Sequence, residues 1–257
     1  MQRRIAQYEA LRDPYRCLDL ARRLAAARVE SQIRYLLRAT RGHKNQERPE
    51  ALSTGVAEMR MHLRALATEH DIDAVRGHEG AAARRYFELL PLLLRADLPD
   101  SMIPDGRNRR PPRDRFNALL SYGYALLYRS VIEALLAVGL EPAFGFFHTP
   151  RSAAHPLVLD VMELFRVVVW DVPLIGSVNR LHWDADADFA VTREAVWLSD
   201  SGRRKAIVLY EQRLEDTWRH PVVDYSLSYG RTIELEARLL EKEWSGQPGL
   251  FARSRLR

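Results

Sequence analysis

The chain has 257 residues, of which 47% are hydrophobic and 28% charged, a balance typical of a globular protein with its own core and not of a disordered chain. Its net charge of +5 comes almost entirely from arginine, which suits a polyanionic partner such as nucleic acid, although solvated arginine-rich helices produce the same charge. No apolar run is long enough to span a membrane and the N-terminus does not resemble a signal peptide, so we expect a cytoplasmic protein. The single cysteine, Cys17, excludes a disulfide framework and a thiolate metal site, and we interpret it as a buried structural thiol.

The first part of the chain has helical periodicity. Asp13 and the proline after it predict a capped helix start, and apolar residues then recur at spacings of three and four as far as residue 37. We expect a second helix over 49–70 and a third over 71–94, kinked at Pro91.

The segment 99–115, PDSMIPDGRNRRPPRDR, has too many proline, glycine and charged residues to pack, and it predicts a mobile basic loop. The apolar run over 116–138 predicts a long helix that ends at Gly139. After a loop that contains His148, the helical pattern resumes at residue 156 and continues to residue 181.

The only credible sheet is a short hairpin in DFAVTREAVWLSD, residues 188–200. Its apolar alternation runs through Phe189, Val191, Ala195 and Trp197. Two closing helices are expected, over 200–219 and 226–244. The fold class is therefore expected to be mainly α, with one domain over residues 1–257 and one short β-hairpin.

Two carboxylates stand among apolar residues in the helix after residue 156. Asp160 and Glu163 are three residues apart, so a helix would place them on one face. They can belong to an exposed ion ladder that Arg166 completes. They can also form an oxygen-rich site for Mg²⁺ or Mn²⁺, because the loop with His148 leads into the same helix. Spacing alone leaves both interpretations open.

The stretch RGHEGAAARRYFELL, residues 76–90, offers a further ligand. Glu79 lies between two glycines and before three alanines, which leaves room for a bulky group to approach its carboxylate, and Arg84 could meet a phosphate beside it. A glutamate that only stabilises the start of a helix is the alternative interpretation. His78 points about a quarter-turn away from Glu79 and is not expected to be a ligand.

Four motifs follow one another along the chain: RGHEGAAARRYF (76–87), NALLSYGYALLY (117–128), GLEPAFGFFH (139–148) and LVLDVMELFR (157–166). Together with SDSGRRKAIVLYEQRL near the C-terminus, they resemble the CRISPR-associated spacer integrase, the Cas-one family. Any one motif would be weak support. Their common order and spacing make the resemblance specific.

The resemblance implies a mainly α, multi-helix catalytic domain of the CRISPR-associated integrase type, which inserts short duplex DNA into the repeat array. The metal triad of the family carries over onto Glu79, His148 and Glu163, and Asp160 matches an additional acidic position beside the metal. The implied cofactor is Mg²⁺ or Mn²⁺. The implied partners are double-stranded DNA, as prespacer and repeat, the small Cas-two protein, and a second copy of the chain.

Attack of a DNA 3′-hydroxyl on a phosphodiester needs a cation that polarises the phosphoryl oxygen, and positioned ligands for that cation. We therefore expect a metal-dependent DNA integrase and endonuclease that works by transesterification. A catalytically silent DNA-binding or scaffold subunit is one alternative, although the intact triad argues against it. A hydrolytic nuclease that uses water as nucleophile is the other.

Other residues are expected near the DNA. Arg84 and Asn117 are predicted to contact a phosphate or the surroundings of the site. Tyr86, Tyr122 and Tyr124 can stack on DNA or belong to the core. Four arginines of the 99–115 loop can follow a DNA backbone or be merely solvated; they are Arg107, Arg109, Arg110 and Arg113.

The start of the chain departs from the family pattern. Family members usually begin with a small β-rich domain that contributes to dimerisation, whereas this chain begins near the entrance of the helical domain. We therefore expect a fragment, a part of a fusion polypeptide or a compact variant.

Overall fold

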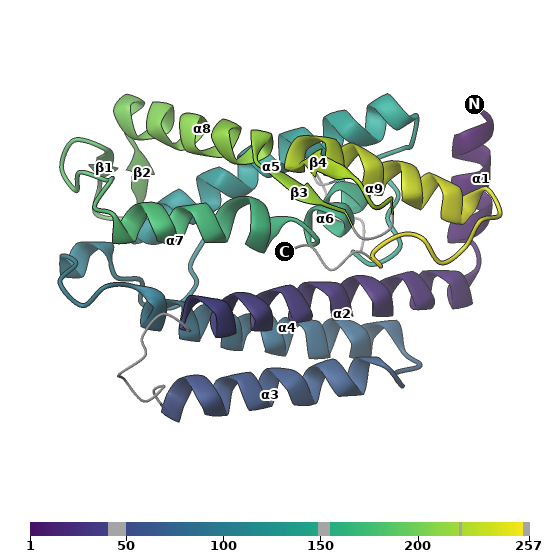
Figure 1. The fold of residues 1–257 in the computed structure, drawn as a ribbon, viewed down its shortest axis with the longest axis horizontal. Coiled ribbons are helices and arrows are strands. Elements are labelled where there is room, and N and C mark those ends of the chain that lie inside the picture. Colours follow the sequence, from purple (N-terminus) through teal and green to yellow (C-terminus); the bar gives the residue numbers. More distant parts are fainter. Residues whose placement is uncertain (41–49, 149–154, 221–222, 254–257) are drawn as a thin grey trace.

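The computed structural model describes residues 1–40, 50–148, 155–220 and 223–253. Its helices form two layers, as Figure 1 shows, and the predicted mainly helical fold is confirmed. Helices α2 (Pro14–Ala39), α3 (Glu50–Leu66) and α4 (Ile72–Leu89) lie side by side in the first layer. The remaining helices form the second layer, and α1 (Gln2–Leu11) crosses the end of the molecule.

The first layer begins and ends its helices close to the predicted positions. The Asp13 carboxylate accepts a hydrogen bond from Tyr15 N at 2.9 Å and caps α2 as expected. Helix α3 lies inside the predicted range, whose residue 49 is outside the described residues. Asp71 caps α4, but this helix stops at Leu89 instead of continuing through a kink, and the 3₁₀ turn η1 (Leu90–Leu93) follows it.

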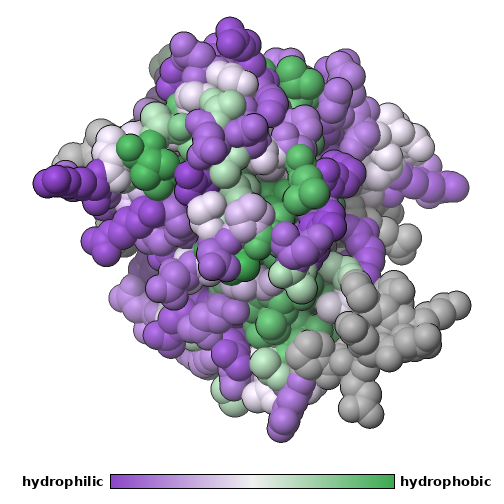
Figure 2. Space-filling view, turned by 90° about the vertical axis from the view of Figure 1, so that its left-hand side faces the viewer, coloured by the Kyte–Doolittle hydropathy of each residue, from purple (hydrophilic) through white to green (hydrophobic). Residues whose placement is uncertain are grey.

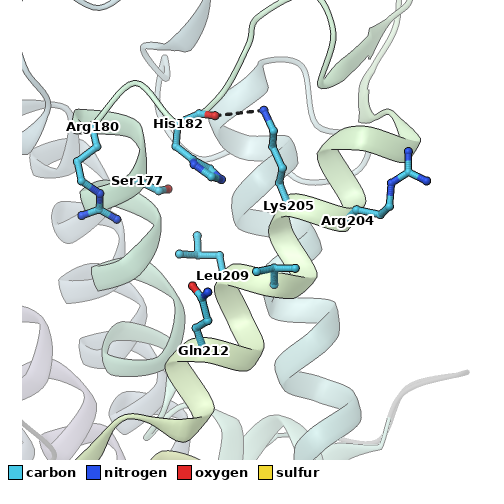
Figure 3. A pocket seen from close by; sticks show the side chains of 8 residues that line it. Ser177, Arg180, His182, Arg204, Lys205, Leu209 and Gln212 are labelled. Carbon is cyan, nitrogen blue, oxygen red and sulfur yellow. Dashed lines mark hydrogen bonds between the residues drawn. The ribbon is translucent and has the colours of Figure 1, made fainter.

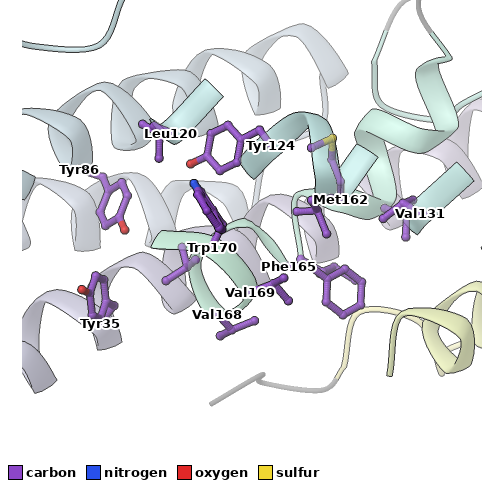
Figure 4. Packing of buried hydrophobic residues seen from close by; sticks show 14 of the residues in the cluster. Tyr35, Tyr86, Leu120, Tyr124, Val131, Met162, Phe165, Val168, Val169 and Trp170 are labelled. Carbon is purple, nitrogen blue, oxygen red and sulfur yellow. The ribbon is translucent and has the colours of Figure 1, made fainter. Parts of the chain in front are cut away.

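The long helix α5 (Arg115–Val138) is the centre of the second layer. Gly139 ends it with a φ of +88°, a left-handed conformation that favours glycine, as its place after the apolar run predicted. Inside the helix, Gly123 lets Trp170 pack directly on the backbone, because a Cβ at this position would overlap the indole ring. Trp170 Nε1 also donates to the carbonyl of Leu119 at 3.1 Å. Figure 4 shows this indole among the buried tyrosines and aliphatic side chains of the core.

The chain after α5 is helical but irregular. Helix α6 (Pro156–Met162) has only seven residues, and the π-helical turn η3 (Arg166–Asp171) and α7 (Val172–Asn179) follow it. Such wide turns are frequent at functional sites, because they alter which side chains face inward. The second layer is completed by α8 (Asp200–Glu215) and α9 (Tyr229–Trp244).

The predicted hairpin is present, but its apolar alternation was wrong. Strands β1 (Phe189–Val191) and β2 (Val196–Leu198) pair antiparallel, with Phe189 opposite Leu198. Phe189, Val196 and Leu198 are buried, whereas Trp197 is exposed. Trp197 therefore lies on the opposite face from Phe189.

A second hairpin was not predicted. Strands β3 (Thr217–Arg219) and β4 (Ser226–Ser228) pair antiparallel where the closing helices were expected to end and begin. Trp218 stacks on Tyr229, and its Nε1 donates to Thr232 at 3.0 Å. Contacts with other elements thus hold these strands in place. Three residues are too few for an alternation of apolar and polar residues to predict a strand from the sequence.

The surface of the described part has no sign of a membrane span. None of its helices is both long and apolar enough to cross a bilayer. Figure 2 views the molecule from the end that carries β1 and β2, where hydrophilic side chains cover most of the surface and apolar ones emerge in small groups. Cys17 is half-buried rather than fully buried, and its thiol donates to the carbonyl of Leu11.

Candidate active site

The predicted triad comes from three different segments. Glu79 lies on α4, His148 ends the described loop after α5, and Glu163 directly follows α6. Arg28 of α2 joins two of them, because its Nη1 pairs with Glu79 Oε1 and its Nε lies 2.9 Å from Glu163 Oε2. All three partners in this arrangement are at least nine-tenths buried. The two layers of the molecule therefore meet at a guanidinium held between two carboxylates.

A second arginine contacts the same carboxylate. Arg166 Nε donates to Glu163 Oε2 at 2.8 Å, and its guanidinium lies 4.4 Å from the centre of the Tyr124 ring. Burial would raise the pKa of Glu163, but Arg166 and Arg28 outweigh burial and hold that pKa below its ordinary value. The pair of Glu163 and Arg166 is thus real but internal, and the exposed ion ladder is excluded.

Asp160 is surrounded by hydrogen-bond donors of the protein itself. Its Oδ2 accepts from the backbone N–H groups of Phe146 and Phe147 at 2.8 and 3.1 Å. Its Oδ1 accepts from the backbone N–H and the ring Nδ1 of His148 at 2.8 and 2.7 Å. A carboxylate has about four lone-pair positions, and all of them are used here. Asp160 therefore holds the loop and His148, and it has no position left for a metal ion.

This loop also explains Gly145 and the orientation of the imidazole. A Cβ at residue 145 would collide with Asp160 Oδ2, so only glycine lets the loop close over the carboxylate. Because Nδ1 of His148 donates to Asp160, the lone pair of the neutral ring is on Nε2. A carboxylate that fixes a histidine in this way is the usual support of a metal-binding imidazole.

The donor set can be tested for its fit to a metal. Within the described ranges, no three His, Cys, Asp or Glu side chains are arranged as the ligands of an ion. Chemically, two carboxylates and an imidazole without a thiolate suit Mg²⁺ or Mn²⁺. The guanidinium of Arg28 already lies between Glu79 and Glu163, in a place that attracts a cation. The donor types thus suit a divalent cation, whereas in this structure Arg28 lies between the two carboxylates.

Two of the predicted DNA contacts belong to the interior instead. Tyr86 is completely buried and its hydroxyl donates to Asp171 Oδ2 at 2.9 Å. Asn117 is buried at the start of α5, where its amide donates to the carbonyl of Gly106 and accepts from Arg107 Nη1, both at 2.8 Å. Asn117 organises the loop before α5 and is not available to a phosphate.

The four arginines of the 99–115 loop that were predicted to contact DNA fall into two groups. Arg107 donates to Asn117 and Ser121 and lies 5.8 Å from the centre of the Tyr124 ring. The loop therefore packs against α5 here, contrary to the prediction. The other three predicted arginines are exposed, as is Arg84 on α4, and they stay predictions for DNA contact: Arg109, Arg110 and Arg113.

Sequence reasoning missed two residues, Arg28 in the site and Asp171 near it. Asp171 accepts hydrogen bonds from the hydroxyls of Tyr86 and Tyr124, and burial raises its pKa to about 6 although these bonds oppose the shift. Both residues had a signal in the sequence. Arg28 stands on the apolar face of α2, and Asp171 follows the run VVVW, where a charge is costly without a partner.

A hollow elsewhere on the surface contains none of the triad. It has a volume of about 390 Å³, lies between α7 and α8, and is lined by residues that include Arg180, His182 and Lys205. Figure 3 shows that Lys205 reaches the carbonyl of His182, and its Nζ also lies 2.6 Å from Asp188. The ammonium group of Lys205 in this hollow is therefore already compensated by the Asp188 carboxylate.

Comparison with known proteins extends over most of the chain. The family described as CRISPR associated protein Cas1 matches residues 1–212. A CRISPR-associated exonuclease Cas4/endonuclease Cas1 fusion of Leptospira interrogans serogroup Icterohaemorrhagiae serovar Lai (strain 56601) is 56% identical over 100% of this chain and 47% of its own length. The CRISPR-associated endonuclease Cas1 1 of Moorella thermoacetica (strain ATCC 39073 / JCM 9320) is 37% identical over 95% of this chain and 71% of its own.

Solved structures share the fold. A CAS1 protein from Thermotoga maritima has a TM-score of 0.79 at 23% identity, over 95% of this chain and 70% of that one. A casposase bound to integration product has a TM-score of 0.82 at 22% identity, over 98% and 71%. At these identities the likeness concerns the fold. The chain spans about half the length of the fusion relatives that it matches. Because the family match covers residues 1–212, the chain belongs to the Cas1 family of CRISPR-associated proteins.

Proposed function

We propose that this chain is the catalytic part of a metal-dependent DNA integrase and endonuclease of CRISPR adaptation. It joins the 3′-hydroxyl ends of short duplex DNA to the repeat array by transesterification. The observation that carries this proposal is the buried pair of Glu79 and Glu163, brought from two layers to one cation beside a histidine that Asp160 orients. A helical scaffold has no need of two buried carboxylates at such a place.

The residues of the chain divide the work. Glu79, Glu163 and Nε2 of His148 would hold Mg²⁺ or Mn²⁺, which when bound polarises a phosphoryl oxygen of DNA. Asp160 keeps the proton of His148 on Nδ1, so that Nε2 stays available as a ligand. Arg166 contacts Glu163 and the Tyr124 ring, and it would hold the carboxylate in place when a metal ion binds.

The nucleophile is the point at which an integrase and a hydrolytic nuclease differ. The site does not select it, because any oxygen held in line with the phosphorus will attack. We favour the DNA 3′-hydroxyl, since a structural neighbour is a casposase bound to integration product and its likeness covers 98% of this chain. The relatives named endonucleases leave hydrolysis as the alternative.

The partners follow from the relatives. A chain of a Cas6-RT-Cas1--Cas2 complex has a TM-score of 0.81 at 25% identity, over 100% of this chain and 27% of that one. We propose that this chain likewise works with the Cas-two protein and double-stranded DNA, as a homodimer. The fusion relatives support a larger polypeptide with a Cas4-type exonuclease part.

A joining assay tests the proposal. A labelled short duplex with free or blocked 3′ ends is mixed with a supercoiled repeat-containing plasmid, Mn²⁺, the chain and the Cas-two protein. The chain should produce branched products only from free ends. Glu79→Ala, His148→Ala and Glu163→Ala should each remove them, and Glu88→Ala, which changes an exposed glutamate of the same helix as Glu79, should not. Equal nicking with free and blocked ends and no branched product would leave the hydrolytic nuclease.

A further inference from the structure

Arg28 occupies an unusual position for an arginine. It lies in the middle of α2, and only 9% of its surface is exposed. Its guanidinium is shared by two carboxylates that come from α4 and from the residue after α6. Burial lowers the pKa of this arginine, although Glu163 acts in the opposite direction. Its charge is therefore kept inside the protein by Glu79 and Glu163 together.

The charges of the four directly paired side chains already balance without a metal. Glu79 and Glu163 contribute two negative charges, and Arg28 and Arg166 contribute two positive ones. A divalent cation added to these four side chains would place further positive charge beside two guanidinium groups in a buried place. Such crowding is costly, because like charges a few ångströms apart repel strongly where water is scarce.

The two arginines are not equivalent in this balance. Arg166 is three residues from Glu163 and is stacked on Tyr124, so it contacts one carboxylate and lies beside the pair. Arg28 bridges both carboxylates, which means that its guanidinium lies where an ion shared by Glu79 and Glu163 would have to lie. A metal ion can thus coexist with Arg166 but must displace Arg28.

We propose that the guanidinium of Arg28 occupies the metal site when no metal ion is bound. It competes with the divalent ion for Glu79 and Glu163 and thereby sets the affinity of the site for that ion. This inference rests on the proposed function, because it takes these carboxylates as the metal ligands. The displaced guanidinium needs an anion, and a DNA phosphodiester supplies one. Metal and DNA therefore bind cooperatively, since each helps to separate Arg28 from the carboxylates.

The test measures Mn²⁺ binding directly, by electron paramagnetic resonance of free Mn²⁺ with the full metal-free chain. Arg28→Met should bind Mn²⁺ at least about tenfold more tightly than the unchanged chain, because the ion no longer has to displace a guanidinium from Glu79 and Glu163. Arg34→Met is the matched control on the same helix, where Arg34 lies 3.5 Å from Glu30, and it should leave the affinity unchanged. Equal or weaker binding by Arg28→Met would overturn the proposal.

Two further measurements complete the test. A short DNA duplex should tighten Mn²⁺ binding to the unchanged chain more than to Arg28→Met, and equal tightening would contradict the proposed competition. If Arg28→Met does not fold, Arg28→Lys replaces it. Lysine keeps a charge but has no fork to bridge both carboxylates, so binding must still be tighter than in the unchanged chain, and unchanged affinity counts against the proposal.

The variant Glu163→Gln distinguishes a failure of the proposed metal site from a failure of the proposed competition by Arg28. If Mn²⁺ still binds this variant as tightly as the unchanged chain, the metal site itself is wrong and the proposed function fails. If Glu163→Gln loses Mn²⁺ while Arg28→Met binds it with unchanged affinity, the metal site stands and only the competition by Arg28 is wrong.

Discussion

Asp160 and Glu163 are three residues apart and both are buried, with 0% and 3% of their surface exposed, but the protein compensates their charges in opposite ways. Asp160 is held by three backbone N–H groups and the ring of His148. Glu163 is held by the side chains of Arg28 and Arg166. Backbone donors cannot leave without unfolding the loop, whereas guanidinium groups on flexible stems can exchange for another cation. The comparison separates a carboxylate held by backbone donors from one held only by side-chain cations.

The largest effect expected from this difference is on activity at Glu163. Glu163→Gln keeps the shape of the side chain and one acceptor oxygen but removes a metal ligand, so strand joining should fall by about a thousandfold or more. Removal of a carboxylate should not stabilise the metal-free fold by relieving repulsion, because Arg28 and Arg166 would lose their partner. Joining assays and urea unfolding check the two statements. Joining at the normal rate would remove Glu163 from the site.

The next effect is on stability at Asp160. Asp160→Ala leaves three backbone N–H groups without an acceptor, those of Phe146 and Phe147 buried and that of His148 partly buried, which should lower the free energy of unfolding by about 3 kcal/mol or more. Mn²⁺ binding should weaken too, because His148 loses the group that fixes its ring. Asp186→Ala, an exposed aspartate on another loop, is the control for both measurements. A chain with Asp160→Ala that is as stable as the unchanged one would show that the loop does not depend on this carboxylate.

How well the sequence predicts the contacts of a residue depends on how far apart in the sequence the contacting residues lie. Helix limits at Asp13 and Gly139 follow from capping, which involves neighbours in the chain, and the sequence predicted both. The triad was assigned by resemblance to a family. The separate functions of Asp160 and Glu163 were missed, because a helical period places them on one face, whereas α6 ends at Met162 between them.

Contacts between distant segments account for the other errors. Asn117 was predicted to meet DNA, but the loop before α5 folds back and uses its amide. The hairpin of β3 and β4 depends on Trp218 packing against α9. The pairing of Arg28 with Glu79 and Glu163 joins residues 51 and 135 positions apart in the sequence, which no local pattern encodes. The sequence shows a charge on an apolar face, and only the fold shows its partner.

Asp171 represents a third way to hold a buried carboxylate, and it predicts a pH effect. Tyrosine hydroxyls bind it, but burial raises its pKa from 3.8 to about 6. Between these values the folded chain binds more protons than the unfolded one, so the free energy of unfolding should fall as the pH rises, by roughly 3 kcal/mol in total. Asp171→Asn removes this titration, and its stability relative to the unchanged chain should therefore increase from pH 4 to about 6.5.

Urea unfolding of both chains across that range measures the effect. The difference between the two chains is the relevant quantity, because carboxylates such as Glu163, whose pKa is lowered, change both chains in the same way. A difference that does not vary with pH would show that the hydroxyls of Tyr86 and Tyr124 fully compensate the burial of Asp171.

The smallest expected effect concerns the arginines before α5, because one of them is bound by the protein and the others are exposed. Arg107 is bound by Asn117 and Ser121, whereas Arg109, Arg110 and Arg113 are exposed. If the exposed arginines meet phosphates, their joint replacement by glutamine should flatten the slope of log affinity against log salt on duplex DNA, by at most about 0.9 for each lost contact. Arg107→Gln should instead lower the free energy of unfolding and leave the slope unchanged, because its partners are inside the protein. An unchanged slope in the triple variant would mean that these side chains are only solvated, and the DNA would then have to be held by other basic residues.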